Sequence, residues 1–241
     1  MTVSETITRQ IEKIPEAISF GYADLNIPRQ DFLSAAKALE RLQKKGLIQK
    51  LSKGKFYKPK QTPFGEKKPD EQQILKPYLY QHGKRIAYIT GGTLYNQLGL
   101  TTQVPATIQI ASRDKRISIN TGALKATPVK SYVDVTEENY QMLGFLDAMK
   151  DLKRIPDVDV NQAIAIFQKR IERLTNQQVQ SLIDYALCYP PRVRALLGAL
   201  LESLKNSNRL TILRDSLNPL THFDFGLDPS RLPTAANWNI R

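Results

Sequence analysis

The side chains best suited to do chemistry in this sequence are cations that gather near its N-terminus. Between residues 37 and 60 there are nine Lys or Arg residues and a single acidic one, Glu40, so a tenth of the chain holds about two thirds of the formal net charge of +12. Ammonium and guanidinium groups bind phosphate, and such an excess is typical of proteins that bind nucleic acid or an anionic membrane surface. Whether these cations can bind a phosphate backbone depends on the helices and strands on which they lie.

Hydrophobic spacing predicts an ordered set of short elements over the first 60 residues. Isoleucines recur at helical spacing before Pro15, and a short strand at 17–20 and a short helix at 22–25 follow. A longer helix is predicted from 29 to 45, where Gly46 ends it, and then a hairpin of strands 47–51 and 55–58. This order is typical of a winged helix-turn-helix, which we predict for residues 1–60.

The longer predicted helix divides into an apolar and a basic face at about 100° per residue. Its apolar face, expected to pack on the rest of the module, is Phe32, Ala35, Ala36, Leu39 and Leu42. The opposite face would enter the major groove, and the hairpin tip would reach phosphates. The residues expected to contact double-stranded DNA are Arg29, Gln30, Ser34, Lys37, Arg41, Lys44, Lys45, Lys53 and Lys55.

Other interpretations of this basic region stay open. A charged helix face can simply be solvated, and the hairpin can point into solvent or pack on the rest of the chain. RNA or an acidic protein is an alternative partner. RNA is less favoured, because we expect one of the adjacent Phe56 and Tyr57 to lie in the core rather than in a stacking surface.

The rest of the chain predicts an α+β fold that is mostly helical. We expect a linker at 61–75 and a C-terminal domain at 76–241, with an α+β part at 76–156 and a helical part at 157–241. Thr136 is the predicted N-cap of a helix that ends near Lys153. Another helix begins at Pro190-Pro191, with leucines at core spacing. Arg192 and Arg194 lie in its first turn, where the helix dipole disfavours cations, so we expect a buried ion pair or an anionic partner.

The sequence gives little sign of catalysis. We expect no cofactor, no metal site and no enzymatic activity, because the two histidines lack metal-ligand neighbours. Asp147 and Asp151, one helical turn apart, are expected to form surface pairs with Lys150 and Arg154. Cys188, the only cysteine, is expected to be buried, and the sequence shows no membrane span or export signal, which favours the cytoplasm.

The order of several motifs resembles a known family along nearly the whole chain. The motifs are Ile14-Pro15-Glu16, residues 20–25 (FGYADL), 51–58 (LSKGKFYK), 88–92 (YITGG), 96–105 (NQLGLTTQVP), 189–194 (YPPRVR) and 218–220 (NPL). They resemble the AbiEi-like antitoxins of type IV toxin–antitoxin systems, which act in abortive infection, a form of phage defence.

The resemblance implies a transcriptional repressor that binds repeats in its own promoter through the winged domain. It also implies that the C-terminal part counteracts a toxin of nucleotidyltransferase type, without a stable complex. Arg192 and Arg194 are the residues of that part in which we expect the antitoxin role.

Overall fold

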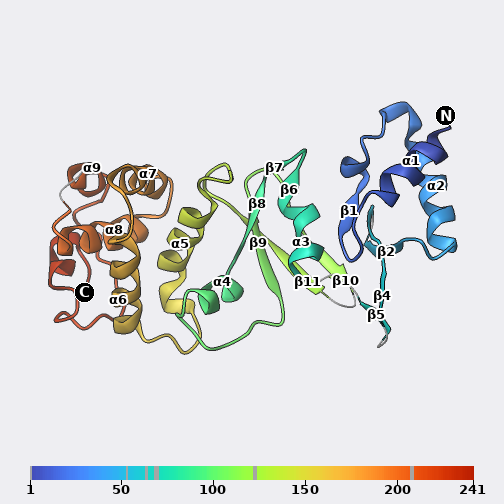
Figure 1. Ribbon diagram of the computed structural model, residues 1–241. Helices are drawn as coiled ribbons and strands as arrows, with labels where there is room; N and C mark the ends of the chain where they lie inside the picture. Colours follow the sequence, from blue (N-terminus) through green and yellow to red (C-terminus); the bar gives the residue numbers. More distant parts are fainter. Residues whose placement is uncertain (1, 53, 63–64, 68–70, 122–123, 207–208) are drawn as a thin grey trace. The chain divides into compact units, whose positions relative to one another are not determined.

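The computed structural model describes residues 2–52, 54–62, 65–67, 71–121, 124–206 and 209–241. Helices and several small sheets form a mixed α+β fold, as predicted (Figure 1). The chain divides into two compact units, one of residues 1–87 and 117–126 and the other of residues 88–116 and 127–241. Within the described ranges, no helix has the length and apolar character needed to cross a membrane.

The first unit is larger than the predicted N-terminal domain of residues 1–60. The predicted linker at 61–75 holds most of a hairpin and the start of a helix, and further short strands follow. Helix α3 packs against strand β1, which explains why these residues group with the first unit. The elements beyond residue 60 in this unit are β4 (Lys60–Thr62), β5 (Gly65–Lys67), α3 (Glu71–Leu79), β6 (Tyr80–Gln81), β7 (Lys84–Arg85) and β10 (Ile119–Thr121).

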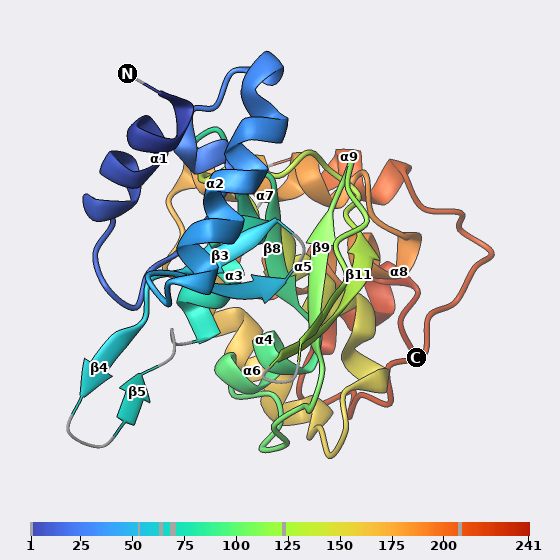
Figure 2. The same cartoon turned by 90° about the vertical axis from the view of Figure 1, so that its right-hand side faces the viewer.

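The first 60 residues fold in the predicted order of elements. A three-stranded antiparallel sheet has the order β1-β3-β2, and α1 packs against α2 beside it (Figure 2). A capping box formed by Thr2 and Glu5 begins α1, which ends at Glu12. The elements are α1 (Val3–Glu12), β1 (Ser19–Gly21), the 3-10 helices η1 (Tyr22–Leu25) and η2 (Arg29–Asp31), α2 (Phe32–Lys44), β2 (Gln49–Ser52) and β3 (Lys55–Tyr57).

The buried face of α2 is rotated relative to the prediction. The side chains in its core are Ala35, Ala38, Leu39 and Leu42, whereas Phe32 is 43% exposed and Ala36 is also exposed. Phe32 stacks on the ring of Tyr22 at a centroid distance of 5.4 Å instead of entering the core. The prediction placed the aromatic Phe32 on the apolar face, whereas the small Ala38, 2% exposed, is the residue that joins the core instead.

The second unit combines a small sheet with a group of helices. Strands β11, β9 and β8 lie in that order, and β9 and β11 run side by side in Figure 2. The elements are β8 (Ala87–Thr90), α4 (Gly92–Gln97), β9 (Ile108–Ser112), β11 (Leu124–Lys130), α5 (Tyr140–Asp151), η3 (Leu152–Arg154), α6 (Val160–Ile171), α7 (Asn176–Ala186), α8 (Pro191–Ser203), α9 (Leu210–Asp215) and η4 (Pro233–Trp238). The first residue of β8 groups with the first unit, and β11 passes from one unit to the other at residue 127.

Helix α5 begins later than predicted. The N-cap is Asn139 rather than Thr136, and the helix starts at Tyr140. The backbone N–H of Thr136 donates to the Asn139 side chain at 2.8 Å, and the Glu138 N–H donates to the Thr136 hydroxyl at 3.3 Å. These bonds form a separate turn that precedes the helix. Thr136 is a residue type that caps helices, but here its side chain stabilises this turn and does not cap α5.

Helix α8 is the centre of the second unit, and the C-terminal segment packs on it. Val193 and the leucines from 196 to 201 are buried, as their spacing predicted, and burial extends to Ala195, Gly198 and Ala199, whereas Leu204 is only partly buried. Trp238 lies against Gly198 and donates its indole N–H to the Glu202 carboxylate, and the Thr234 hydroxyl donates to the Ala199 carbonyl at 2.7 Å. The segment after Asn218 is therefore an integral part of this unit.

The contact between Gly198 and Trp238 leads to a prediction about the free energy of unfolding. A methyl group at Gly198 would overlap the six-membered part of the rigid indole ring. We expect Gly198→Ala to lower the free energy of unfolding by about 1–3 kcal/mol, although alanine favours a helix. The matched control is Gly144→Ala in α5, where the added carbon would meet a terminal methyl of the flexible Leu94 side chain at 2.8 Å. Urea unfolding followed by circular dichroism should show the larger loss at Gly198. Equal stability of Gly198→Ala and wild type would contradict this packing.

Candidate nucleic-acid interface

Seven of the nine predicted DNA-contacting residues lie at the surface of the first unit along η2 and α2. Arg29 and Gln30 are exposed on η2, and Lys45 is the exposed C-cap of α2. The exposed residues of α2 itself include Ser34, Lys37, Arg41 and Lys44. The structure therefore brings these seven residues together along one continuous segment, from 29 to 45, whose other face is core.

The two cations Lys37 and Arg41 form no ion pair in the part of the chain that the structure describes, although the charge of Arg41 adds to the effect of Lys44 in lowering the pKa of Glu40. They lie one turn apart on α2, and both are exposed. Lys44 differs, because it pairs with Glu40 at 2.9 Å, and this hydrogen bond and charge lower the pKa of Glu40. Among the described residues, Lys37 and Arg41 are the α2 cations that form no ion pair.

Local structure fixes the position of α2. Gly46 follows the C-cap with a φ of +73°, and the N–H of Leu47 donates to the Leu42 carbonyl at 3.0 Å. This is the glycine-dependent end of the helix that the sequence predicted. Ile48, fully buried just beyond it, anchors the chain between α2 and β2. Buried residues and the helix end therefore hold α2 in place, and the cations on its outer face are not needed for this.

The structure describes one of the two lysines that are expected to bind phosphate at the hairpin tip. Lys53 lies outside the described residues. The Lys55 ammonium donates to the Pro77 carbonyl at 2.8 Å and lies over the Tyr78 ring, so it holds the hairpin on α3 of the same unit. Phe56 and Tyr57 are both buried, which corrects the expectation that only one of them is in the core. These contacts leave η2 and α2 as the best-defined part of the basic surface.

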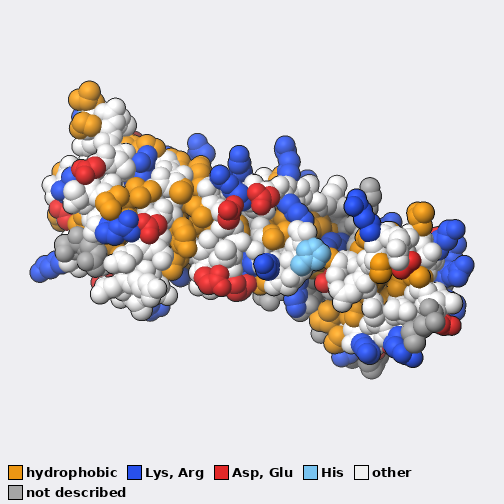
Figure 3. Space-filling model, turned by 90° about the horizontal axis from the view of Figure 1, so that it is seen from above, with side chains coloured by type: hydrophobic (Ala, Val, Ile, Leu, Met, Phe, Trp, Pro, Cys, Tyr) orange, Lys and Arg blue, Asp and Glu red, His pale blue; other side chains and the backbone are white. Residues whose placement is uncertain are grey.

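Charge is distributed unequally between the two units. The first unit carries 18 Lys or Arg and 9 Asp or Glu residues, and the second carries 17 and 14, so their formal net charges are +9 and +3. Figure 3 shows Lys and Arg side chains exceeding Asp and Glu at its right-hand end, where the N-terminal residues lie. The electrostatic attraction for a polyanion is concentrated in the first unit.

Arg192 and Arg194 do not form the expected ion pair. Arg192 lies over the ring of Phe225, with its guanidinium carbon 4.8 Å from the centroid, and Arg194 donates to the Ser216 carbonyl at 3.0 Å. No hydrogen-bond acceptor within the described ranges reaches the buried Nε of either residue. Both side chains hold the segments after α8 against its first turn, through an aromatic ring and a backbone carbonyl. The hydrogen bond from Lys153 is the main cause of the lowered pKa of Asp224, and the charge of Arg192 contributes to it without a direct ion pair.

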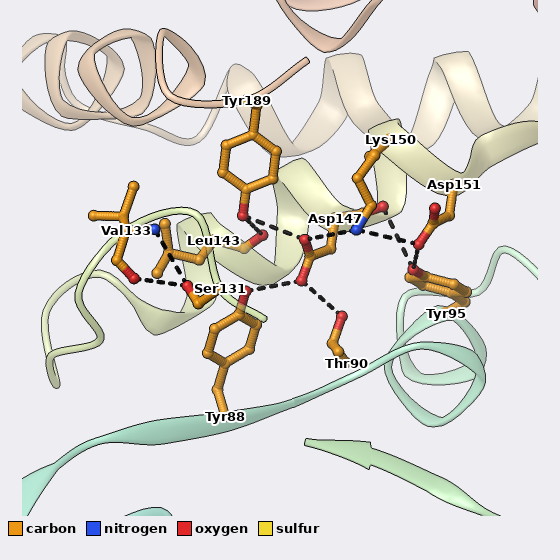
Figure 4. Close-up of polar contacts among 10 residues, drawn as sticks. All are labelled: Tyr88, Thr90, Tyr95, Ser131, Val133, Leu143, Asp147, Lys150, Asp151 and Tyr189. Atoms are coloured by element: carbon orange, nitrogen blue, oxygen red, sulfur yellow. Dashed lines mark hydrogen bonds and ion pairs between the residues drawn. The ribbon is translucent and has the colours of Figure 1, made fainter. Parts of the chain in front are cut away.

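A buried carboxylate forms a second polar cluster, which the sequence did not predict. Asp147 is 2% exposed within α5, so it is not one of the surface pairs expected from the spacing (Figure 4). Its Oδ2 accepts hydrogen bonds from the hydroxyls of Tyr88 and Thr90, both at 2.8 Å. Its Oδ1 accepts from the Tyr189 hydroxyl at 3.3 Å and pairs with the Lys150 ammonium at 3.4 Å.

Burial and charge shift the pKa values in this cluster. Burial raises the pKa of Asp147, against the opposing effects of Lys150 and of the hydrogen bonds from Thr90 and Tyr88. The pKa values of Tyr88 and Tyr189 are raised well above the usual tyrosine range. Burial is the larger cause, and the charge of Asp147 is the next. Burial opposes the shift of Lys150, but the two nearby carboxylates raise its pKa. The hydroxyls and the ammonium group are therefore donors at neutral pH.

The hydrogen bonds of the cluster join β8, α4 and α5 to Tyr189, which lies just before α8. Asp151 accepts a hydrogen bond from the Tyr95 hydroxyl at 2.7 Å and pairs with Lys150 at 3.6 Å. Within the described ranges Arg154, the partner expected for Asp151, forms no ion pair. In the described part of the chain, no three His, Cys, Asp or Glu side chains are grouped so as to hold a metal ion. The contacts of the polar cluster are those of a structural network.

Cys188 is exposed, contrary to the prediction, because it lies in the turn after α7 rather than on a buried helix face.

These features define a mixed α+β protein with a basic N-terminal unit and a second unit built on a buried helix. The chain belongs to the family described as a family of unknown function (DUF6088), which its residues 18–151 match. No curated protein matches the sequence.

Among solved structures, the RV2827C protein from Mycobacterium tuberculosis is similar to this chain with a TM-score of 0.52 and 13% sequence identity. The match covers 92% of this chain and 84% of the other. At this identity the similarity shows a shared fold.

Proposed function

We propose that the chain is a DNA-binding regulator whose first 60 residues act as a winged helix-turn-helix. In this proposal α2 is the recognition helix and enters the major groove, which is wide enough to admit an α-helix. The observation that carries the proposal is the exposed face of α2, on which Lys37 and Arg41 lie one turn apart opposite a buried face. Arg29 and Gln30 extend the same surface at the start of the helix.

Electrostatics support duplex DNA as the partner. Phosphate contacts supply most of the affinity of DNA-binding proteins, and the first unit holds +9 of the net charge of +12. Lys45, as the C-cap of α2, adds charge at the other end of the helix. The burial of both Phe56 and Tyr57 favours DNA over single-stranded RNA, because recognition of single-stranded RNA relies on exposed aromatic rings for stacking.

The regulatory part of the proposal is supported by the sequence resemblance to the AbiEi-like antitoxins. It consists of repression of the chain's own operon and of opposition to a nucleotidyltransferase-type toxin. The contacts of Arg192 and Arg194 are explained by packing on Phe225 and Ser216, so we assign the toxin-directed role to the second unit and not to these two side chains.

Footprinting of the full chain on the DNA upstream of its own gene tests the proposal. We expect protection of repeated sequences in the promoter, and a loss of protection as salt rises from 50 to 200 mM, since bound phosphates release counterions. Protection should survive an excess of unrelated RNA. No protection at low salt, or binding to RNA in preference to the promoter, would contradict the proposal and favour an RNA or acidic protein partner.

A further inference from the structure

Helix α2 carries an exposed leucine on the side opposite its core. Leu33 is 82% exposed in the first turn of the helix, immediately after Phe32. At about 100° per residue, the buried side chains of α2 centre on a direction that lies about 170° from Leu33. Leu33 therefore points almost directly away from the core.

Polar groups surround this leucine on the same face. Lys37 follows it by four residues and Lys44 by eleven, with Glu40 between them in the same stripe. Within the described residues of the first unit, the other large hydrophobics that are clearly exposed are Phe32 and Leu47, at 43% and 52%. An apolar side chain in the first turn of a basic helix matches a partner that is a polyanion and also exposes an apolar group.

DNA offers one such group in the major groove, the 5-methyl group of thymine. An apolar side chain can read an A·T pair by contact with this methyl, whereas phosphate contacts carry no sequence information. A recognition helix contacts bases through its N-terminal residues, and Leu33 is the second residue of α2. Gln30, exposed three residues earlier, can bond adenine in a neighbouring pair.

We infer that Leu33 is a specificity-determining residue that reads thymine through its 5-methyl group. This inference rests on the proposed binding of α2 in the major groove and assigns a base to it. The operator then contains an A·T pair opposite the first turn of α2, and Lys37 and Arg41 hold the neighbouring backbone. Leu33 contributes nothing to the core, so its truncation changes recognition and not folding.

Replacement of thymine by deoxyuridine tests the inference, because it removes only the methyl group. The footprinted duplex is compared with the same duplex containing deoxyuridine, using the full chain. We expect the wild type to bind the deoxyuridine duplex about fourfold more weakly for each thymine that is read. Leu33→Ala should bind the thymine duplex about fourfold more weakly than the wild type, and should bind both duplexes equally.

The control is Leu220→Ala, the same truncation at a leucine that is 85% exposed in the second unit. This variant should respond to deoxyuridine as the wild type does. A thymine preference that is equal in the wild type and in Leu33→Ala would overturn the inference, since the preference would then come from DNA shape. Equal wild-type binding of both duplexes would also overturn it, while DNA binding itself would stand. Absence of binding to either duplex would instead contradict the proposed function.

Discussion

Asp147→Ala is expected to lower the free energy of unfolding of the second unit by about 3–5 kcal/mol, because the buried hydroxyls of Tyr88 and Thr90 lose the acceptor that lies 2.8 Å from each of them. Lys150 loses one of its two carboxylate partners and keeps Asp151 at 3.6 Å. Stabilities of whole domains are about 5–15 kcal/mol, so this loss is a large fraction. Trp238 is the only tryptophan and is buried in this unit, and its fluorescence during urea unfolding measures the change.

Asp184→Ala is the matched control for this prediction. Asp184 pairs with Arg209 in the same unit, but its side chain is 52% exposed, and exposed pairs contribute about 0–1 kcal/mol. Asp147→Asn keeps the shape and should lose less than Asp147→Ala. A loss below about 1 kcal/mol for Asp147→Ala would show that the network does not hold β8 and α8 to α5.

Asp147→Asn should also change how stability depends on pH. Burial raises the pKa of Asp147 in the folded chain above its ordinary value of 3.8. The folded state therefore binds the proton more tightly, and this group makes stability fall as pH rises through the raised pKa. The asparagine variant lacks that contribution, so its stability relative to the wild type should rise with pH across this window.

The double variant Lys37→Ala/Arg41→Ala is expected to weaken binding to the promoter duplex by about thirtyfold, from two lost contacts of about 1 kcal/mol each. Both side chains are exposed on α2, so their truncation leaves no cavity and the free energy of unfolding should change by less than about 0.5 kcal/mol. Gel-shift titration and thermal unfolding measure the two quantities on the full chain.

Lys169→Ala/Arg173→Ala supplies the control for this variant. It removes one Lys and one Arg at the same spacing, and both are exposed near the end of α6 in the second unit. Its affinity for DNA should stay close to that of the wild type. A large drop in stability with unchanged DNA affinity for the Lys37/Arg41 variant would mean that the outer face of α2 serves folding instead.

The sequence could predict the elements whose signals are local. Isoleucine spacing indicated α1, Gly46 marked the end of α2, and Pro190-Pro191 with its leucines indicated α8. In each of these the residues that decide the structure lie within a few positions of one another. Exposure of the cations on α2 follows from the same spacing.

Long-range contacts explain what the sequence could not predict. Asp147 resembled a surface charge, since Lys150 and Asp151 follow it on the same helix, but its buried partners Tyr88 and Tyr189 lie 59 and 42 residues away in the chain. A usable signal was present, because Asp147 lies in an otherwise uncharged run from Leu143 to Met149, all of which α5 buries. The contact of Lys55 with Pro77 had no such signal, because it depends on where α3 packs.

The dependence of DNA affinity on salt tests the central claim most directly, namely that α2 of the first unit binds the backbone of duplex DNA. Each phosphate contact adds about 0.9 to the slope of log affinity against log salt. We predict that Lys37→Ala/Arg41→Ala lowers this slope by about 1.8 relative to the wild type, whereas Lys169→Ala/Arg173→Ala leaves it unchanged. An unchanged slope for the α2 variant, or an equal decrease for both variants, would contradict the claim.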